Sequence, residues 1–247
     1  MKNLSNLAQQ NIDNLTSLWQ TVGERANAHI SGADFDFSIV SNSEWPNRLW
    51  FHSDIDAVGI SKAKKIIQVK NTPLIVPYWD IYQNQSYELL ETNGFENVSE
   101  QIGMGLAFDQ TYKESSILQI EKVYEDEQAL LWGNLFKEAF GYKISHNLLL
   151  PNYEHIDFFL VFHEEEPVGT IILHNTNNTV IGIHAMGIIP SMRRKGFAEQ
   201  LMKQMLNLSM AKGFKYAVLQ ASSMGKGLYQ KLGFQEQFIM KNYSLKR

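Results

Sequence analysis

The sequence predicts a mixed α/β fold in which helices flank a central sheet. Two patterns along the 247 residues support this: apolar and aromatic runs typical of strands, and apolar stripes at helical spacing between them. A polar stretch over 109–116 separates two such series. We therefore expect one domain over 1–110 and a second over 111–247.

The first series opens with an amphipathic helix over 6–22, which we expect to end at Gly23. The segments after it are bounded by turn residues such as Pro46 and Gly94. In order, we expect strands over 36–40 and 48–51, a helix over 60–69, a buried strand over 73–77, a short helix over 87–92 and a strand over 101–108.

The second series contains a hairpin, with strands over 157–163 and 168–174 joined by the acidic turn 164–167. From Ala198 the apolar residues follow the stripe of a helix packed on a sheet, until Gly213 ends it. The other expected elements are a strand over 117–123, a helix over 126–141, a short helix with Ser145 as its N-cap, strands over 180–188 and 216–219, a short helix over 226–231 and a strand over 238–245.

Composition excludes several functional classes. The absence of cysteine excludes disulfides, thiolate metal ligands and a cysteine nucleophile. A net charge of -4 with scattered basic residues gives no reason to expect a nucleic acid or an anionic membrane as partner. No apolar run approaches the roughly 20 residues of a membrane span, and the first ten residues lack the apolar core of a secretory signal. We therefore expect a cytoplasmic protein.

The run Arg-Arg-Lys-Gly-Phe-Ala over 193–198 joins a strand to an amphipathic helix. This context brings unpaired backbone N–H groups and the positive end of a helix dipole to one point, where a phosphate fits. Gly196 removes a side chain where an oxygen would approach, and the small Ala198 lets the helix start lie close to a ligand. The loop predicts a pyrophosphate site, with an ordinary basic turn as the alternative.

Two motifs in order resemble those of the GNAT N-acetyltransferases. Ile188-x-Pro190 followed by Arg-x-x-Gly-x-Ala is similar to motif A, and Leu-Tyr-Gln-Lys-Leu-Gly-Phe over 228–234 is similar to motif B. The resemblance covers 117–247 and implies the GNAT acyl-CoA N-acyltransferase fold, with a central sheet splayed open after Ile188 so that pantetheine can insert. It also implies acetyl-CoA (coenzyme A) as co-substrate, and no metal is needed.

The same resemblance implies which residues contact coenzyme A. They are Met186, Gly187, Ile188, Arg193, Arg194, Lys195, Gly196, Phe197, Ala198, Ser222 and Tyr229. Ser222 stands where the family often carries an Asn that hydrogen-bonds the pantetheine arm, and Gly225 replaces a common Ala. Because Ser still offers a donor and an acceptor, we expect coenzyme A binding to persist.

Tyr229 resembles the family's general acid. A phenol of pKa about 10 protonating a thiolate of about 8.5 goes uphill by roughly 2 kcal/mol, so a hydrogen bond to the developing charge can suffice. The alternative is that Tyr229 only packs against Leu228 and Phe234. The oxyanion is expected to meet a backbone N–H near Ile188, again by resemblance.

His184 is the candidate base, because residues 182, 184, 186 and 188 of an extended strand share a face and some family members carry His or Glu there. The alternative is a hydrogen-bonded core histidine. Glu154 and His155 could face the acceptor, or belong to a solvated loop. His163-Glu164 lacks a second His four residues on, so we expect no metal site in the acidic turn.

The first half resembles a degenerate copy of the second, because 88–96 aligns with 227–235 at three positions. Leu90 replaces Tyr229 in that alignment, and Gly103-Met104-Gly105 is not a second phosphate loop, since Glu100 stands where Arg is required. We therefore expect an N-terminal α/β GNAT-like subdomain that binds no coenzyme A and instead walls the acceptor pocket, with 42–48 as one contributor.

The leading hypothesis is an enzyme, a monomer or homodimer, that moves an acetyl group from acetyl-CoA to a primary amine of a small molecule or peptide by direct attack. The alternative is a catalytically idle acyl-CoA sensor or partner-binding protein. The acceptor would be selected by the segments 40–56 and 142–157.

Overall fold

The computed structural model describes residues 2–70, 72–82, 84–115 and 117–246. Its first half contains α1 (Lys2–Arg25), β1 (His29–Ile30), β2 (Phe35–Ser38), β3 (Arg48–Phe51), α2 (Ala57–Lys70), β4 (Ile75–Trp79), α3 (Tyr87–Thr92) and β5 (Phe95–Ala107). Every helix and strand predicted for this half is present. β5 is longer than expected, because the strand already begins beside the turn at Gly94.

The second half contains β6 (Gln119–Lys122), α4 (Asp126–Phe140), two 3-10 turns η1 (His146–Leu148) and η2 (Leu150–Asn152), the strands β7 (Ile156–His163), β8 (Glu166–Asn175) and β9 (Val180–Ile188), a 3-10 turn η3 (Pro190–Met192), α5 (Phe197–Ala211), β10 (Tyr216–Ala221), α6 (Lys226–Lys231) and β11 (Gln235–Leu245). Ser145 precedes η1 as expected but makes no side-chain cap. Between β5 and β6 the described residues form neither helix nor strand; Ser116 of the predicted linker, like Arg247, lies outside them. The boundary near residue 110 stays a prediction.

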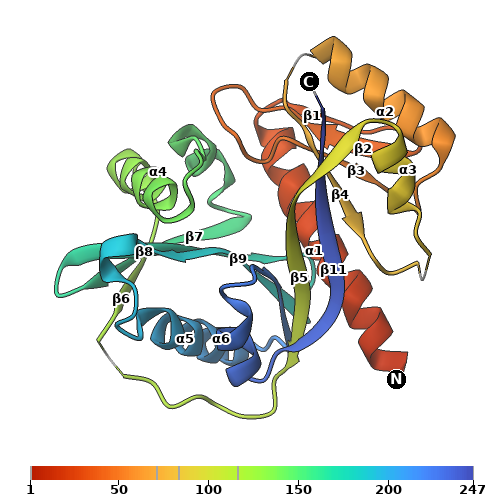
Figure 1. Ribbon diagram of the computed structural model, residues 1–247. Helices are drawn as coiled ribbons and strands as arrows, with labels where there is room; N and C mark the ends of the chain where they lie inside the picture. The colour runs from red at the N-terminus through yellow and green to blue at the C-terminus, as the bar shows by residue number, and fades with distance from the viewer. Residues whose placement is uncertain (1, 71, 83, 116, 247) are drawn as a thin grey trace.

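The two halves exchange their last strands within one eleven-stranded sheet. The strand order is β1-β2-β3-β4-β11-β5-β10-β9-β8-β7-β6. β5 ends the first half but lies antiparallel between β10 and β11, while β11 ends the second half and lies antiparallel between β4 and β5. The long strands β5 and β11 lie side by side at the centre of Figure 1. Each half therefore supplies a strand that the other half needs.

The repeated order of elements matches the degenerate copy expected from the sequence. β2, β3, α2, β4, α3 and β5 in the first half correspond to β8, β9, α5, β10, α6 and β11 in the second. In both halves the two central parallel strands pair only at their start: β9 with β10 over 180–182 and 216–218, and β3 with β4 at Arg48 and Ile75. Beyond those pairs no further ladder joins the strands, so the sheet opens at two corresponding places.

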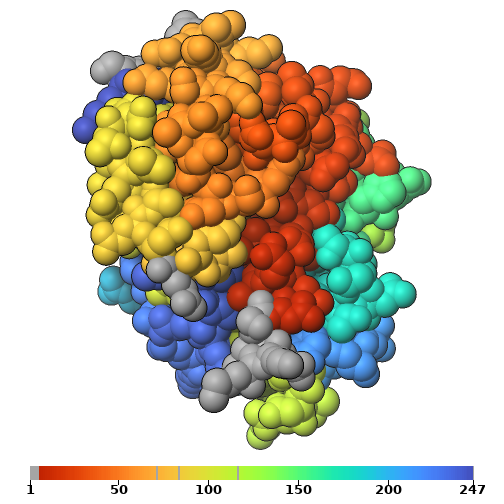
Figure 2. All heavy atoms as spheres, turned by 90° about the vertical axis from the view of Figure 1, so that its right-hand side faces the viewer, coloured from red at the N-terminus to blue at the C-terminus, as the bar shows by residue number. Residues whose placement is uncertain are grey.

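Helices cover both faces of the sheet. In Figure 1, α4 lies above the second-half strands and α5 and α6 lie below them. One core forms between the sheet and α1 with α4, a second between the second-half strands and α5 with α6, and a third between the first-half strands and α2 with α3. The red atoms of α1 lie at the seam between the orange and yellow first half and the cyan and blue second half (Figure 2).

The prediction that α1 ends at Gly23 is wrong, because the helix continues to Arg25. Gly23 has a packing role instead: a Cβ there would overlap the Ser38 side chain, which lies against the helix. The helix terminus is followed by Asn27 at φ 51°, a left-handed conformation that asparagine tolerates better than most residues.

Candidate active site

A cavity of about 510 Å³ lies between the two halves. Its walls come from α1, the loop before β3, β5 and β11 on one side, and from α4, β9, β10 and α6 on the other. Met186, Ser222 and Tyr229 line it where β9 and β10 diverge, and Trp45 and Arg48 line it from the predicted loop 42–48. The cavity therefore connects the opening of the second-half sheet to side chains of the first half.

The end of β9 is reshaped by a β-bulge. The β8–β9 register slips between Thr170 and Ile172, Ala185 adopts φ 48°, and the Thr170 hydroxyl donates to the Ala185 carbonyl at 3.1 Å. Because β9 gains one residue here, His184 and Gly187 oppose Ile172 and Thr170 and share a face. The expectation that 182, 184, 186 and 188 share one face is wrong: Ile188 points to the α5 side with Ile183.

His184 is buried, with 8% of its surface exposed. The Asn14 amide nitrogen donates to the His174 carbonyl at 3.0 Å, so the Asn14 oxygen faces His184 and accepts from its Nε2 at 2.8 Å. Burial, together with nearby His174, lowers the pKa of His184 to about 3. This is the geometry of the hydrogen-bonded core histidine. A base with so low a pKa is a poor proton acceptor for an attacking amine.

Tyr229 lies on α6, with its ring centre 5.8 Å from that of Phe234 in an edge-to-face arrangement, and lines the cavity. Burial raises the pKa of Tyr229 to about 12. Full proton transfer to a thiolate of pKa about 8.5 would then cost roughly 5 kcal/mol. The hydroxyl is accordingly better suited to donate a hydrogen bond to developing negative charge than to give its proton away. The side chain packs against Phe234 and also lines the cavity, and its role as a general acid stays a prediction.

The loop between β9 and α5 presents a helix start without a side-chain cap. Gly196 is the N-cap residue at φ 81°, and a Cβ at this position would have no atom within 4 Å, so glycine is needed for the backbone conformation while the space above it stays open. Arg194 and Lys195 are exposed beside it. The first N–H groups of α5 and two cations therefore face solvent together, as an anion site requires.

Arg193 has a different role from its neighbours. Its Nε donates to the Ile188 carbonyl at 3.0 Å and its Nη2 to the Ala139 carbonyl at 2.7 Å. The guanidinium thus ties the loop to the end of β9 and to α4. We infer that its main contribution to a bound pyrophosphate is the shape of the loop and long-range positive potential.

The corresponding helix of the first half begins differently. Before α2, the Asp56 carboxylate accepts from the Gly59 N–H at 2.7 Å, and Asp54 accepts from the Ile55 N–H at 2.9 Å. One N–H group of this helix start is therefore satisfied by the chain's own carboxylate, and Asp54 and Asp56 make the local charge negative. This gives a physical reason for the expectation that the first half binds no coenzyme A.

Ser222 lines the cavity beside the start of α6. Its hydroxyl oxygen accepts from the Gly225 N–H at 3.2 Å, and its carbonyl accepts from the Lys226 N–H at 3.0 Å. The hydroxyl hydrogen remains available to a ligand carbonyl. Ser222 can therefore serve the hydrogen-bonding role that the resemblance gives to this position.

The other predicted site residues divide into packing and cavity positions. Gly187 lies under Phe140, whose ring a Cβ would overlap, and Phe197 is buried with its ring 4.6 Å from that of His163. Ala198 is half-buried at the second position of α5. Glu154 and His155 lie at a separate surface depression with Arg25, away from the cavity.

Several cavity residues were not predicted from the sequence: Trp19 of α1, Phe136 and Phe140 of α4, and Gln101 of β5, whereas Tyr142 belongs to the predicted acceptor segment 142–157. A signal did exist in α1, where Asn11 and Asn14 interrupt an apolar stripe and are both fully buried. Asn11 donates to the Met104 carbonyl at 3.1 Å and accepts from Gln220 at 2.6 Å. These asparagines attach α1 to the sheet beside the cavity.

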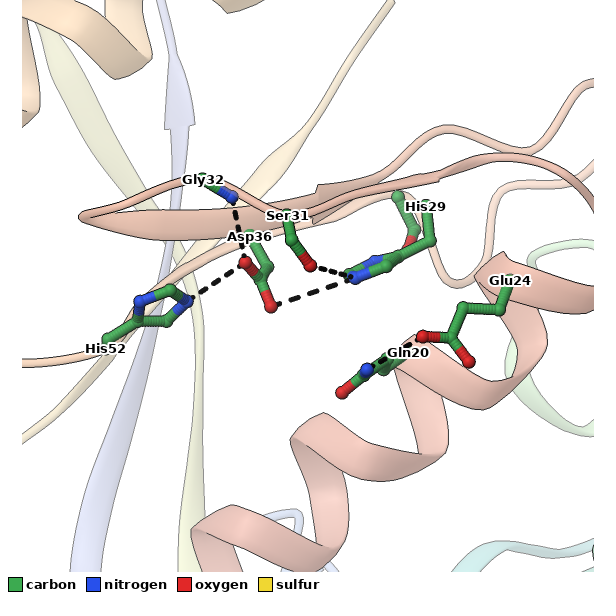
Figure 3. A network of polar contacts seen from close by, with 8 residues as sticks. Gln20, Glu24, His29, Ser31, Gly32, Asp36 and His52 are labelled. Carbon is green, nitrogen blue, oxygen red and sulfur yellow. Dashed lines mark hydrogen bonds and ion pairs between the residues drawn. The ribbon is translucent and has the colours of Figure 1, made fainter.

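A second polar cluster lies in the first half, outside the cavity (Figure 3). Asp36 on β2 accepts from the Gly32 N–H at 3.2 Å, and its carboxylate lies 3.0 Å from His52 Nε2 and 3.7 Å from His29 Nε2. His29 also contacts the Ser31 hydroxyl at 3.0 Å. The cluster holds the turn 31–34 against β3. Over the ranges that the structure describes, no group of three or more His, Asp or Glu side chains is placed to hold a metal ion.

Comparisons with known proteins agree with this geometry. The model of the acetyltransferase (GNAT) family matches residues 119–234. No curated protein matches the chain. Among the described helices, none has the length and apolar character to cross a bilayer.

Solved structures are similar over most of the chain. A GCN5-related N-acetyltransferase from Kribbella flavida gives a TM-score of 0.71 at 13% identity, over 98% of this chain and 95% of that one. One from Sphaerobacter thermophilus gives 0.60 at 16% identity, over 87% and 82%. A tandem GNAT protein from the clavulanic acid biosynthesis pathway gives 0.55 at 8% identity, over 86% and 79%. Residues 119–234 are therefore a domain of the GNAT acetyltransferase family, and the chain as a whole has the GNAT fold.

Proposed function

We propose that the chain transfers an acetyl group from acetyl-CoA to a primary amine of a small molecule or peptide by direct attack. One observation carries the proposal: the uncapped start of α5 lies at the end of β9, and the divergence of β9 from β10 leads from there into the cavity that Tyr229 lines. The anion site for the pyrophosphate, the opening between β9 and β10 for the pantetheine and the cavity for the reacting groups thus follow one another.

In the proposed reaction, the N–H groups of α5 with Arg194 and Lys195 bind the pyrophosphate, and Ser222 donates to the pantetheine arm. The amine nitrogen forms a bond to the thioester carbonyl carbon, a backbone N–H near the bulge in β9 stabilises the oxyanion, and the C–S bond then breaks. The amine releases a proton to water, and the Tyr229 hydroxyl hydrogen-bonds the departing thiolate.

His184 is the weaker of the two catalytic candidates in this scheme. Its low pKa and its hydrogen bond to Asn14 suit a neutral residue that supports the wall formed by β9 and α1. The base role therefore remains a hypothesis, to be decided by substitution.

The test is thiol release from acetyl-CoA with a panel of primary amines, using the wild type, Tyr229→Phe and the matched control Tyr153→Phe, which alters an exposed tyrosine away from the cavity. We expect turnover with at least one amine and a loss of about 10- to 10³-fold in kcat for Tyr229→Phe alone. Coenzyme A binding without turnover on any amine, with equal behaviour of the two variants, would instead establish the alternative of an idle acyl-CoA sensor.

A further inference from the structure

Among the described residues that line the cavity, two carry a charge, Arg48 and Glu100. Arg48 is the first residue of β3 and follows a loop that its own polar groups hold in place. The Asn47 side chain donates to the Ser43 carbonyl at 2.8 Å and accepts from the Val40 N–H at 2.7 Å, and the Ser43 hydroxyl donates to the Trp45 carbonyl at 2.6 Å. The guanidinium therefore projects from a fixed base.

The Arg48 guanidinium is poorly satisfied by the protein. Its Nη1 donates to the Asn47 carbonyl at 3.1 Å, while its Nε is buried and has no hydrogen-bond partner in the described chain. None of the ion pairs formed by described residues includes it. An arginine has five N–H donors, and a buried cation without a counterion is costly. The unused donors are thus available to an anion that enters the cavity.

Glu100 does not serve as that anion. Its side chain is exposed, and its Oε1 accepts from the Asn97 amide at 2.9 Å. The Arg48 guanidinium instead lies 5.8 Å from the centre of the Trp19 ring, which is uncharged. Trp45, Phe136 and Tyr142 line the same cavity, so part of its wall is aromatic.

We propose that Arg48 binds a carboxylate of the acceptor, and that the acceptor is a free amino acid-like molecule with a primary amine, a carboxylate and an apolar or aromatic body. The inference rests on the proposed acyl transfer to an amine. A carboxylate matches the planar donor fork of arginine, and the aromatic walls match an apolar body. A cavity of about 510 Å³ is of the size that small-molecule sites have.

The first test compares kcat/KM for L-phenylalanine, L-phenylalaninamide and 2-phenylethylamine, with acetyl-CoA as donor. The wild type should prefer the acid, and Arg48→Met should lose about 10- to 100-fold on the acid, mainly through KM, while changing less than about 3-fold on the amide and the amine. The matched control Arg25→Met alters an arginine outside the cavity and should retain the preference. Equal losses on all three acceptors, or no preference in the wild type, would refute the role of Arg48.

A second measurement does not depend on turnover. 3-Phenylpropanoate has the carboxylate and the ring but no amine, and titration calorimetry should show that it binds the wild type more tightly than 3-phenylpropanamide does. Arg48→Met should abolish this difference. Arg48→Lys, which keeps the charge but not the two parallel N–H donors of the guanidinium, should keep part of it. Circular dichroism establishes that each variant is folded. If the acid binds no more tightly than the amide to the wild type, the inference fails. If the acid binds more tightly than the amide and Arg48→Met removes this difference, but no amine is acetylated, only the proposed reaction is refuted.

Discussion

The replacement of His184 by Gln distinguishes a core histidine from a catalytic base. Burial holds the pKa of His184 at about 3 and that of His174 at about 4, against about 6.5 for an unfolded chain. Below about pH 6.5 these two histidines therefore bind protons in the unfolded state but not in the folded state, and the free energy of unfolding decreases as pH falls. Above that pH the contribution of the two neutral histidines to stability is complete.

The size of the effect follows from one proton per histidine. Each contributes at most about 1.4 kcal/mol per pH unit, so the slope of the two together approaches about 2.7 kcal/mol per pH unit near pH 5. His184→Gln removes one of the two protons and should reduce the slope by about half. Gln can keep a donor toward the Asn14 oxygen.

The assay is urea unfolding followed by tryptophan fluorescence at several pH values from 7.5 to 5, with His146→Gln as the control. The free energy of unfolding of the wild type and of this control should fall with the steeper slope. A slope unchanged in His184→Gln would refute the burial argument. The kcat/KM of His184→Gln should stay within about 3-fold of the wild type at pH 7.5, whereas loss of a catalytic base would lower kcat/KM by about 10²- to 10⁴-fold.

Three further substitutions test the phosphate loop, its first-half counterpart and the cavity wall. Gly196→Ala should raise the KM for acetyl-CoA about tenfold, because a side chain disfavours φ 81°; an unchanged KM in steady-state kinetics would contradict this. Asp56→Ala should lower the free energy of unfolding by about 1 kcal/mol through loss of the cap on α2, without creating a second coenzyme A site in calorimetry; a stoichiometry of two would disprove the argument. Gly187→Val should reduce activity with little loss of coenzyme A affinity, since its side chain would displace Phe140 at the cavity; unaltered turnover would count against it.

Local signals in the sequence predicted the elements and the donor side. The helical stripe from Ala198, the hairpin before it and the glycine at 196 each depend on neighbours a few residues away, which is why they could be recognised. The structure confirms the GNAT fold that these motifs implied.

Features that depend on distant residues were not predicted. The position of β5 between β10 and β11 is decided by pairing across more than a hundred residues, and periodicity carries no information on a partner strand. The bulge at Ala185 broke the alternation used for His184, because one inserted residue reverses the faces beyond it. The loop 42–48 was predicted to line the acceptor pocket, but the particular role of Arg48 was not, since unpaired donors on an arginine are recognised only when its surroundings are known.

The exchange of strands has a consequence for how the chain is made. β4 and β5 cannot complete their pairing until β11, which ends at Leu245, has left the ribosome, so the centre of the sheet closes in one late and cooperative step. The second half expressed alone would lack β5, and β10 and β11 would expose unpaired edges that invite aggregation. Selection can therefore remove the phosphate loop from the first half, but it cannot discard that half without also losing the domain that it completes.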